Sequence, residues 1–215
     1  MYTQHMISEA LLARNELLIS WLLILPWRQR NLRECRVGDD PCNVNVFKAE
    51  RPQLDHLKLP RWLEEAVRTD PHTTFWQYYF REDETKMDHR VRGIIPRALL
   101  PILEEYLVTY RPVLCRTSDP GTLFVTRNGH AFDAKTLREL VCGLTLRFGG
   151  RVVTPHLFRD IVAYKWLDDH PEDYLTVSKI LWHRSIKTTL RIYGRNFDES
   201  NGVAKMDEWL GHRGQ

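Results

Sequence analysis

The stretch "TPHLFRDIVAYKWL" places a histidine and an arginine one turn apart at the start of an expected helix. Thr154 is a good N-cap residue, and Pro155 suits the first helical position. Residues i and i+3 share a helix face, so His156 and Arg159 should project side by side. The helix start carries partial positive charge and free N–H donors, which favours an oxyanion such as phosphate. For these two residues alone, a solvated surface pair is the plainer interpretation.

Two further segments carry polar groups that could take part in phosphate chemistry. Arg28 follows Pro26, which stops the first expected helix. His183 lies at a helix junction, and Tyr193 lies in the last turn before Gly194. Two arginines can bind the non-bridging oxygens of a phosphodiester and neutralise charge in the transition state. A tyrosine hydroxyl can attack phosphorus, and histidine can move or position protons near neutral pH.

In chain order, the five residues Arg28, His156, Arg159, His183 and Tyr193 resemble the active-site series of the tyrosine recombinase (phage integrase) family. "TPHLFRD" resembles that family's His-x-x-Arg box, and "LPWRQRNLRECRVGDD" resembles the box around its first arginine. "LWHRSIKTTLRIYGR" resembles the box that holds a histidine, a Thr-Thr pair and the nucleophilic tyrosine. The resemblance covers nearly the whole chain as a catalytic domain. It implies a site-specific DNA recombinase that forms a 3′-phosphotyrosine intermediate, exchanges strands and religates them.

The sequence departs from the family pattern at three points. His183 and Tyr193 are ten residues apart, one more than in many members. Asn31, three residues after Arg28, stands where the family often has an acidic residue. Trp182 stands where a glycine usually precedes the second histidine. None of these departures removes a reacting group.

The resemblance also implies a general acid, because the family uses a lysine on a β-hairpin. Lys86, in the charged middle of the hairpin expected over 73–96, is the candidate, and Lys48 is the alternative. A solvated lysine in a turn is an equally good interpretation of Lys86. No metal or ATP cofactor is expected, since the phosphotyrosine bond conserves the energy for religation. Other basic residues near the boxes could hold the DNA backbone: Arg30, Lys179, Arg184, Lys187 and Arg191.

Composition limits the class of protein. The 215 residues are 43% hydrophobic and 27% charged, which is typical of a globular domain with a real core. The formal charge of +3 is compatible with nucleic acid as a partner. The longest apolar run, at 17–25, is shorter than the ~20 residues of a membrane span. The four cysteines show no CxxC spacing, so we expect reduced thiols and a cytoplasmic protein.

Apolar periodicity and turn residues predict the elements that must position these groups. The order is helices, then a small set of strands, then helices, which indicates an α+β, mostly α-helical fold. The resemblance implies a tyrosine-recombinase-like catalytic domain with a small antiparallel β-sheet. Helices are expected at 8–25, 30–36, 60–67, 96–110, 133–148, 154–167, 172–183, 185–193 and 202–211, a strand at 44–50 and hairpins at 73–96 and 121–132.

The expected organisation is one catalytic, integrase-like domain over residues 1–215. Only 27 residues precede Arg28, so the family's N-terminal core-binding domain is expected to be absent from this chain. The resemblance implies double-stranded DNA as partner and a tetramer on DNA, with "VAKMDEWLG" docked on its own domain or on a neighbour. Two alternatives stay open: a non-catalytic DNA-binding module derived from the family, and DNA relaxation of the type IB topoisomerase kind.

Overall fold

The chain divides into two compact units, Met1–Val162 and Ala163–Gln215, and the boundary falls inside the helix α7 (Pro155–Asp169). The computed structural model describes residues 3–50, 58–86 and 88–194. The helix expected at 202–211 lies outside the described residues. Within the described part, no helix is long and apolar enough to cross a membrane.

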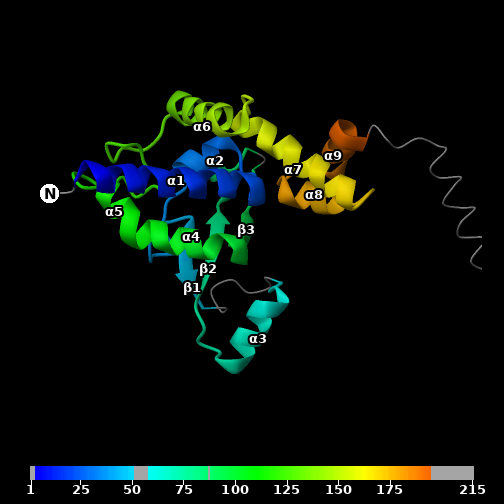
Figure 1. Cartoon of the computed structure of the whole chain (residues 1–215). Coiled ribbons are helices and arrows are strands. Elements are labelled where there is room, and N and C mark those ends of the chain that lie inside the picture. Colours follow the sequence, from blue (N-terminus) through cyan, green and yellow to red (C-terminus); the bar gives the residue numbers. More distant parts are fainter. Residues whose placement is uncertain (1–2, 51–57, 87, 195–215) are drawn as a thin grey trace, which may run out of the picture. The chain divides into compact units, whose positions relative to one another are not determined.

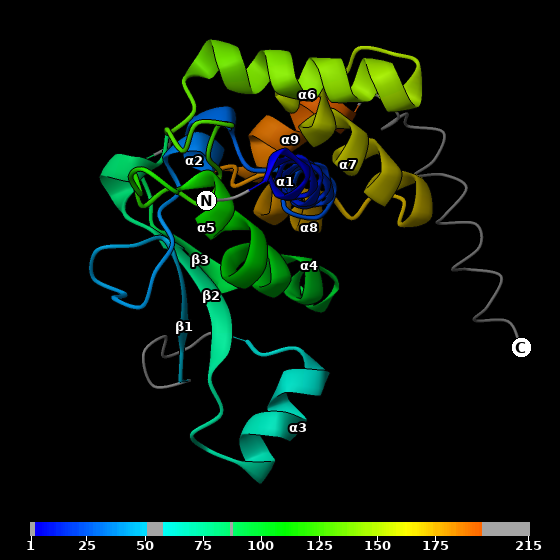
Figure 2. The ribbon, with the colours of Figure 1, turned by 60° about the vertical axis from the view of Figure 1, so that its left-hand side comes forward.

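Helices make up most of the first unit (Figure 1). They are α1 (Gln4–Ile24), α2 (Gln29–Glu34), α3 (Arg61–Thr69), α4 (Leu100–Glu105), α5 (Arg111–Leu114), α6 (Ala134–Gly149) and the first half of α7. The helix α1 lies between α6 on one side and α4 and α5 on the other, as the view along its axis shows (Figure 2). Its buried face therefore forms the centre of the core, with Leu17, Leu18, Trp21 and Leu22 fully buried.

The expected small antiparallel sheet is confirmed. Its strands are β1 (Val46–Ala49), β2 (Phe75–Phe80) and β3 (Val91–Ile94), in the order β1-β2-β3. In the register of β2 and β3, Tyr78 lies opposite Gly93. The helix α3 lies between β1 and β2 in sequence, and its Leu63 and Val67 pack with Phe75 at the start of β2. The turn between β2 and β3 begins with a 3-10 turn at Glu82–Glu84.

The second expected helix is shorter than the sequence indicates. It was expected over 30–36, but α2 ends at Glu34, and Arg36 forms a β-bridge with Thr122 instead. The side-chain oxygen of Asn45 accepts from the Arg36 N–H at 2.9 Å, and the Arg36 carbonyl accepts from the Asn45 N–H at 2.9 Å. These bonds hold the Arg36 backbone in an extended form, so the helix cannot continue.

The helix expected at 96–110 is divided and runs further. A 3-10 turn at Arg97–Leu99 leads into α4, a π-helical turn covers Tyr106–Tyr110, and α5 follows. Pro112 has no N–H to donate to the preceding turn, which accounts for the wider turn before it. The hairpin expected at 121–132 keeps its glycine turn, with Gly129 at φ +78°, but its arms pair only at a single bridge.

The second unit contains the end of α7, α8 (Tyr174–Ile180) and α9 (Ile186–Tyr193). Asp173 caps α8 by accepting from the Thr176 N–H at 3.2 Å, and Ser185 caps α9 as expected. Its core consists of buried residues from the three helices: Ala163, Tyr174, Val177, Leu181 and Tyr193. The sequence pattern was wrong about the end of α8, which stops at Ile180 and leaves His183 in the turn before α9.

Candidate functional site

Aromatic packing fixes the position of Arg28 in the first unit. Arg28 is the N-cap residue of α2, directly after Trp27, which is 1% exposed. The Trp27 ring contacts Trp21 of α1 at 4.9 Å between centroids, and contacts Tyr78 and Phe80 of β2 at 5.2 and 5.0 Å. All three pairs have the edge-to-face geometry that stabilises aromatic clusters. The sheet and α1 thus hold the start of α2 in place.

The guanidinium of Arg28 is well placed to receive an anion. Its side chain is half-buried, and its Nη1 is buried without a hydrogen-bond partner among the described residues. Burial lowers the pKa of Arg28 from its ordinary value, yet an arginine remains a cation at neutral pH. A buried cationic donor without a partner is costly, and an anionic oxygen would satisfy it.

Arg159 lies next to the same segment, although it is distant in sequence. It is 3% exposed, and its Nη1 donates a hydrogen bond to the Pro26 carbonyl, two residues before Arg28. As expected, Thr154 caps the start of α7, since its hydroxyl accepts from the Leu157 N–H at 3.3 Å. The structure therefore brings the segments of the two predicted arginines together. His156, on the same turn of α7 as Arg159, is exposed.

The two candidate lysines have different surroundings. Lys86 is exposed in the turn between β2 and β3 and forms no ion pair with any residue that the structure describes. Lys48 on β1 is paired with Glu104 of α4 at 3.2 Å, and Trp76 also donates to that carboxylate at 2.9 Å. The Lys48 ammonium is thus paired at the sheet, whereas the Lys86 ammonium has no ion-pair partner among the described residues.

The sequence did not indicate how the Lys86 turn is held. Asn31 is 3% exposed, and its amide donates to the Glu84 carbonyl at 2.8 Å. The Glu84 carboxylate in turn accepts from Arg36 and Asn45, each at 3.0 Å. These side chains come from separate polar stretches with no common spacing, so no pattern in the sequence could have grouped them.

In the second unit, His183 is tied to the Thr-Thr pair of its box. The ring Nδ1 of His183 lies 2.9 Å from the hydroxyl of Thr189, which is fully buried. The backbone N–H of His183 donates to the Ser178 carbonyl at 2.9 Å. The preceding Trp182 has φ +53°, in the left-handed region that favours glycine. A glycine would adopt this backbone without strain, whereas Trp182 carries a backbone strain of about 1–2 kcal/mol there.

Tyr193 is the last residue of α9 and is buried within the second unit. It is 7% exposed and belongs to the core of that unit with Val177 and Leu181. Its ring meets the ring of Tyr164 edge-on, with 5.4 Å between centroids. Gly194 follows directly and caps the helix. In this arrangement the Tyr193 ring packs within the core of its unit.

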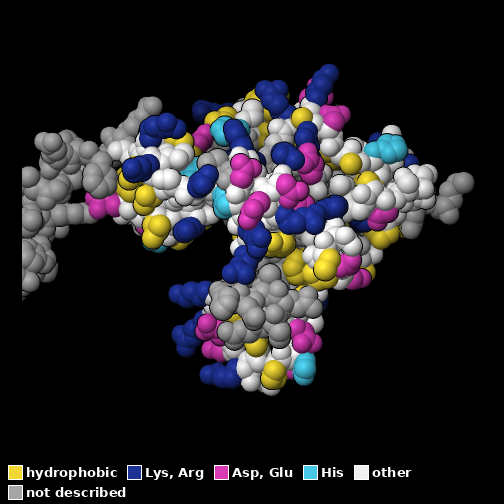
Figure 3. Space-filling view, turned by 180° about the vertical axis from the view of Figure 1, so that it is seen from behind, with side chains coloured by type: hydrophobic (Ala, Val, Ile, Leu, Met, Phe, Trp, Pro, Cys, Tyr) yellow, Lys and Arg dark blue, Asp and Glu magenta, His cyan; other side chains and the backbone are white. Residues whose placement is uncertain are grey.

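Most of the basic residues expected to hold DNA form no ion pair within the described part of the chain. In the second unit, four exposed cations form no ion pair with any described residue: Lys179, Arg184, Lys187 and Arg191. Figure 3 shows Lys and Arg side chains spread over one face of this unit, with hydrophobic side chains among them. Arg30 of α2 instead pairs with Glu34 at 2.9 Å.

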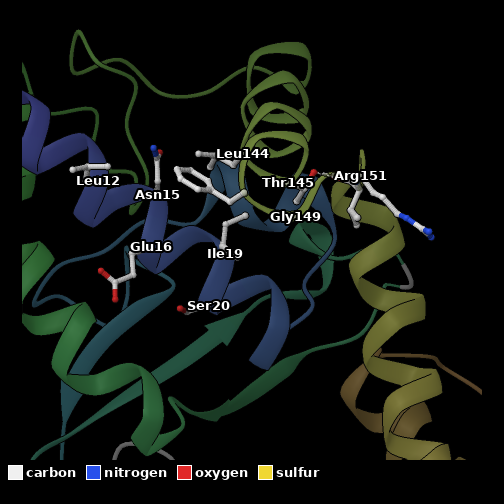
Figure 4. A pocket seen from close by; sticks show the side chains of 11 residues that line it. Leu12, Asn15, Glu16, Ile19, Ser20, Leu144, Thr145, Gly149 and Arg151 are labelled. Carbon is white, nitrogen blue, oxygen red and sulfur yellow. Dashed lines mark hydrogen bonds between the residues drawn. The ribbon is translucent and has the colours of Figure 1, made fainter.

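An apolar groove of about 740 Å³ lies elsewhere in the first unit, between α1 and the end of α6 (Figure 4). Leu12 and Ile19 of α1 face Leu144 and Phe148 of α6 across it. None of the candidate site residues lines this groove. Within the described residues, no group of three or more His, Cys, Asp or Glu side chains is arranged to hold a metal ion.

The candidate residues divide between the two units. Arg28, Lys86, His156 and Arg159 belong to the first unit, with Arg30 on α2. The second unit contains the remaining candidates: Lys179, His183, Arg184, Lys187, Arg191 and Tyr193. Within each unit the structure joins part of the set, namely Arg28 with Arg159 through Pro26, and His183 with Thr189.

No protein-family model matches the sequence, and no curated protein is similar to it in sequence. Several solved structures share its fold. The pre-cleavage complex of the XerH site-specific recombinase bound to difH substrate matches with a TM-score of 0.60 and 18% identity, over 95% of this chain and 50% of that chain. The XerA recombinase matches with a TM-score of 0.52 and 20% identity, over 99% and 62% of the two chains.

A transposon integrase gives a third match. The Tn1549 integrase in complex with transposon right end DNA has a TM-score of 0.54 and 16% identity, over 91% of this chain and 58% of that chain. The chain thus spans about half to three fifths of the length of these recombinases. The likeness is one of fold, and it confirms the expected mostly helical architecture with a small antiparallel sheet, the fold of the tyrosine recombinase catalytic domain.

Proposed function

We propose that residues 1–215 form the catalytic domain of a site-specific DNA recombinase of the tyrosine type. One observation carries the proposal: Arg159 donates to the carbonyl of Pro26, beside Arg28, in a chain with the fold of site-specific recombinases. The XerH and Tn1549 proteins of similar fold bind DNA substrates, which supports double-stranded DNA as the partner here. Assembly as a tetramer on two DNA sites is part of the proposal.

The proposed cleavage step is a transesterification. The Tyr193 oxygen attacks phosphorus and gives up its proton to a histidine of the site, His156 or His183, and the bond from phosphorus to the 5′-oxygen breaks. Arg28 and Arg159 neutralise the charge on the non-bridging oxygens. Lys86 gives a proton to the leaving 5′-oxygen, while His156 and His183 orient the phosphate and move protons. The products are a 3′-phosphotyrosine and a free 5′-hydroxyl.

Religation is the same reaction in reverse. A 5′-hydroxyl from the partner strand attacks the phosphotyrosine, the phosphorus–tyrosine bond breaks, and Tyr193 regains its proton. One phosphodiester is exchanged for another of similar energy. Neither step consumes ATP or changes an oxidation state, so the proposed chemistry needs only the side chains named.

Covalent trapping on nicked DNA tests this function. In such a suicide duplex, the short fragment carrying the 5′-hydroxyl diffuses away after cleavage and prevents religation. We expect a denaturation-resistant protein–DNA band from a library of nicked duplexes with randomised sequence, and sequencing the trapped DNA identifies the site. Tyr193→Phe should abolish the band. Tyr164→Phe is the matched control, because it removes a hydroxyl from the neighbouring ring and should leave the band.

A DNA-binding module without cleavage is the second candidate, and the burial of Tyr193 favours it. Tyr193 is 7% exposed in the core of its unit, which is the environment of a packing residue. This candidate predicts binding of the same duplexes with no covalent band. A band that survives Tyr193→Phe would place the nucleophile at another residue and overturn the assignment.

A further inference from the structure

We propose that Glu84 is a positioning residue that holds the Lys86 turn at a fixed place relative to Arg28. The inference rests on the proposed function, in which Lys86 protonates the leaving oxygen. Lys86 forms no hydrogen bond or ion pair with a described residue, so its own side-chain contacts do not hold it. Its position depends on the turn that carries it.

Glu84 closes the beginning of that turn. One carboxylate oxygen accepts from the Arg81 N–H at 2.8 Å, which closes the 3-10 turn at Glu82–Glu84. On the far side, the buried Thr85 hydroxyl donates to the His89 carbonyl at 2.8 Å. The chain is therefore tied together on both sides of Lys86.

The same glutamate joins this turn to the rest of the first unit. Its other carboxylate oxygen accepts from Arg36 Nη2 and Asn45 Nδ2, both at 3.0 Å. Asn45 is 1% exposed and also donates to the Tyr79 carbonyl on β2 at 3.2 Å. The carboxylate accepts three hydrogen bonds, so it acts as a fixed acceptor within the fold.

Asn31 completes the connection to Arg28. It lies one turn along α2 from Arg28, and its amide donates to the Glu84 carbonyl at 2.8 Å. The helix that begins at the oxyanion-binding arginine thus also holds the turn of the proton donor. A displacement of about 1 Å between reacting groups can reduce a rate by roughly a hundredfold. Loss of the hydrogen bonds of Glu84 or Asn31 should therefore lower the cleavage rate measurably.

The test compares two leaving groups in the trapping reaction. A 5′-bridging phosphorothiolate departs as a thiolate and needs no proton, whereas a normal 5′-oxygen does. We expect Glu84→Gln to slow cleavage of the normal phosphodiester by about ten- to a hundredfold and to cleave the phosphorothiolate at nearly the wild-type rate. Lys86→Ala should show the same pattern with a larger loss. Asn31→Ser is a second variant that should follow Glu84→Gln.

Asp83→Asn is the matched control, because Asp83 shares the 3-10 turn, is exposed and forms no hydrogen bond or ion pair with a described side chain. It should cleave both substrates like the wild type. The positioning role would be overturned if Glu84→Gln cleaved both substrates more slowly by the same factor, or cleaved both at the wild-type rate. A lack of rescue of Lys86→Ala would overturn it as well. If the wild type cleaves neither substrate, the proposed function fails and the inference fails with it.

Discussion

Arg111 and Asp119 form an ion pair at the loop that leads to Thr122, which is connected through Arg36 to Glu84. Two guanidinium nitrogens of Arg111 donate to the Asp119 carboxylate at 2.6 and 2.5 Å, and the same side chain donates to the Thr122 carbonyl. Thr122 pairs with Arg36, which in turn binds Glu84. The hydrogen bond from Arg111 holds the pKa of Asp119 below its ordinary value of 3.8.

We expect Asp119→Asn to lower the free energy of unfolding at pH 7 by about 1–2 kcal/mol, because it removes a charge-assisted hydrogen bond from a half-exposed pair. In the folded wild type, the Asp119 carboxylate binds a proton less readily than it does in the unfolded chain. The contribution of Asp119 is therefore complete above pH 3.8 and is lost as the pH falls through the lowered folded pKa.

Denaturant titrations of wild type and variant between pH 3 and pH 7 measure this difference. Asp39→Asn is the control, since Asp39 is exposed and forms no hydrogen bond or ion pair with another described side chain. The stability difference for Asp119→Asn should shrink toward acid pH, while Asp39→Asn stays close to wild type throughout. A difference that is independent of pH would show that the charge of Asp119 does not contribute.

At the level of single residues, the sequence pattern identified the groups but not their surroundings. The spacing in "HLFR" and the position after Pro26 picked out Arg159 and Arg28, and the structure joins their segments through one backbone carbonyl. The burial of Tyr193 could not be predicted, because it depends on how α7 and α8 pack around it. The role of Asn31 could not be predicted either, because its partner, the Glu84 carbonyl, is a backbone atom without a sequence signature.

At the level of elements, two glycines differ in the space that surrounds their Cβ positions, one in the sheet and one in a helix. Gly93 of β3 lies directly opposite Tyr78, and a Cβ there would lie far inside the contact distance of the Tyr78 hydroxyl. The Tyr78 ring is held in turn by Trp27, directly before Arg28. Gly143, in the interior of α6, has open space around its Cβ position.

Replacement of each glycine by alanine should therefore have opposite effects on the stability of the protein. Gly93→Ala should destabilise the protein by about 1–3 kcal/mol, because the half-buried Tyr78 ring packs against Trp27 and cannot give way without disturbing it. Gly143→Ala should stabilise it by up to about 1 kcal/mol through the higher helix propensity of alanine. Thermal unfolding of the two variants measures both signs, and stabilisation by Gly93→Ala would contradict the packing described.

Caps and turn residues made most element boundaries predictable. Thr154, Asp133 and Ser185 cap the helices where the sequence placed them. Gly129 has the positive φ expected of its turn. The early end of α2 has a different cause, because a distant group, Asn45, competes for the Arg36 backbone. Local sequence carries no information about such a partner, so the early end of α2 could not be predicted.

At the level of the whole molecule, the positive charge is distributed unevenly. The formal net charge is only +3, yet α9 and the residues before it carry four exposed cations without ion pairs to described residues. Lys165 of α7, by contrast, is neutralised by Asp169 at 2.8 Å. Under the proposed function, DNA binding by this unit should therefore depend on the residues around α9 rather than on overall charge.

Salt dependence of DNA binding measures this directly. Each cation that contacts a phosphate releases counterions, so its removal should reduce the slope of log K against log salt by about 0.9. We expect Lys187→Ala and Arg191→Ala each to weaken binding of duplexes of any sequence and to reduce this slope. Lys165→Ala is the matched control in the same unit, because its charge is already paired with Asp169. Since phosphate contacts carry no sequence information, the loss of affinity should be equal for the DNA sequence recovered by trapping and for a scrambled version of it. If Lys165→Ala reduced the slope as much as Lys187→Ala, net charge rather than the α9 region would govern binding.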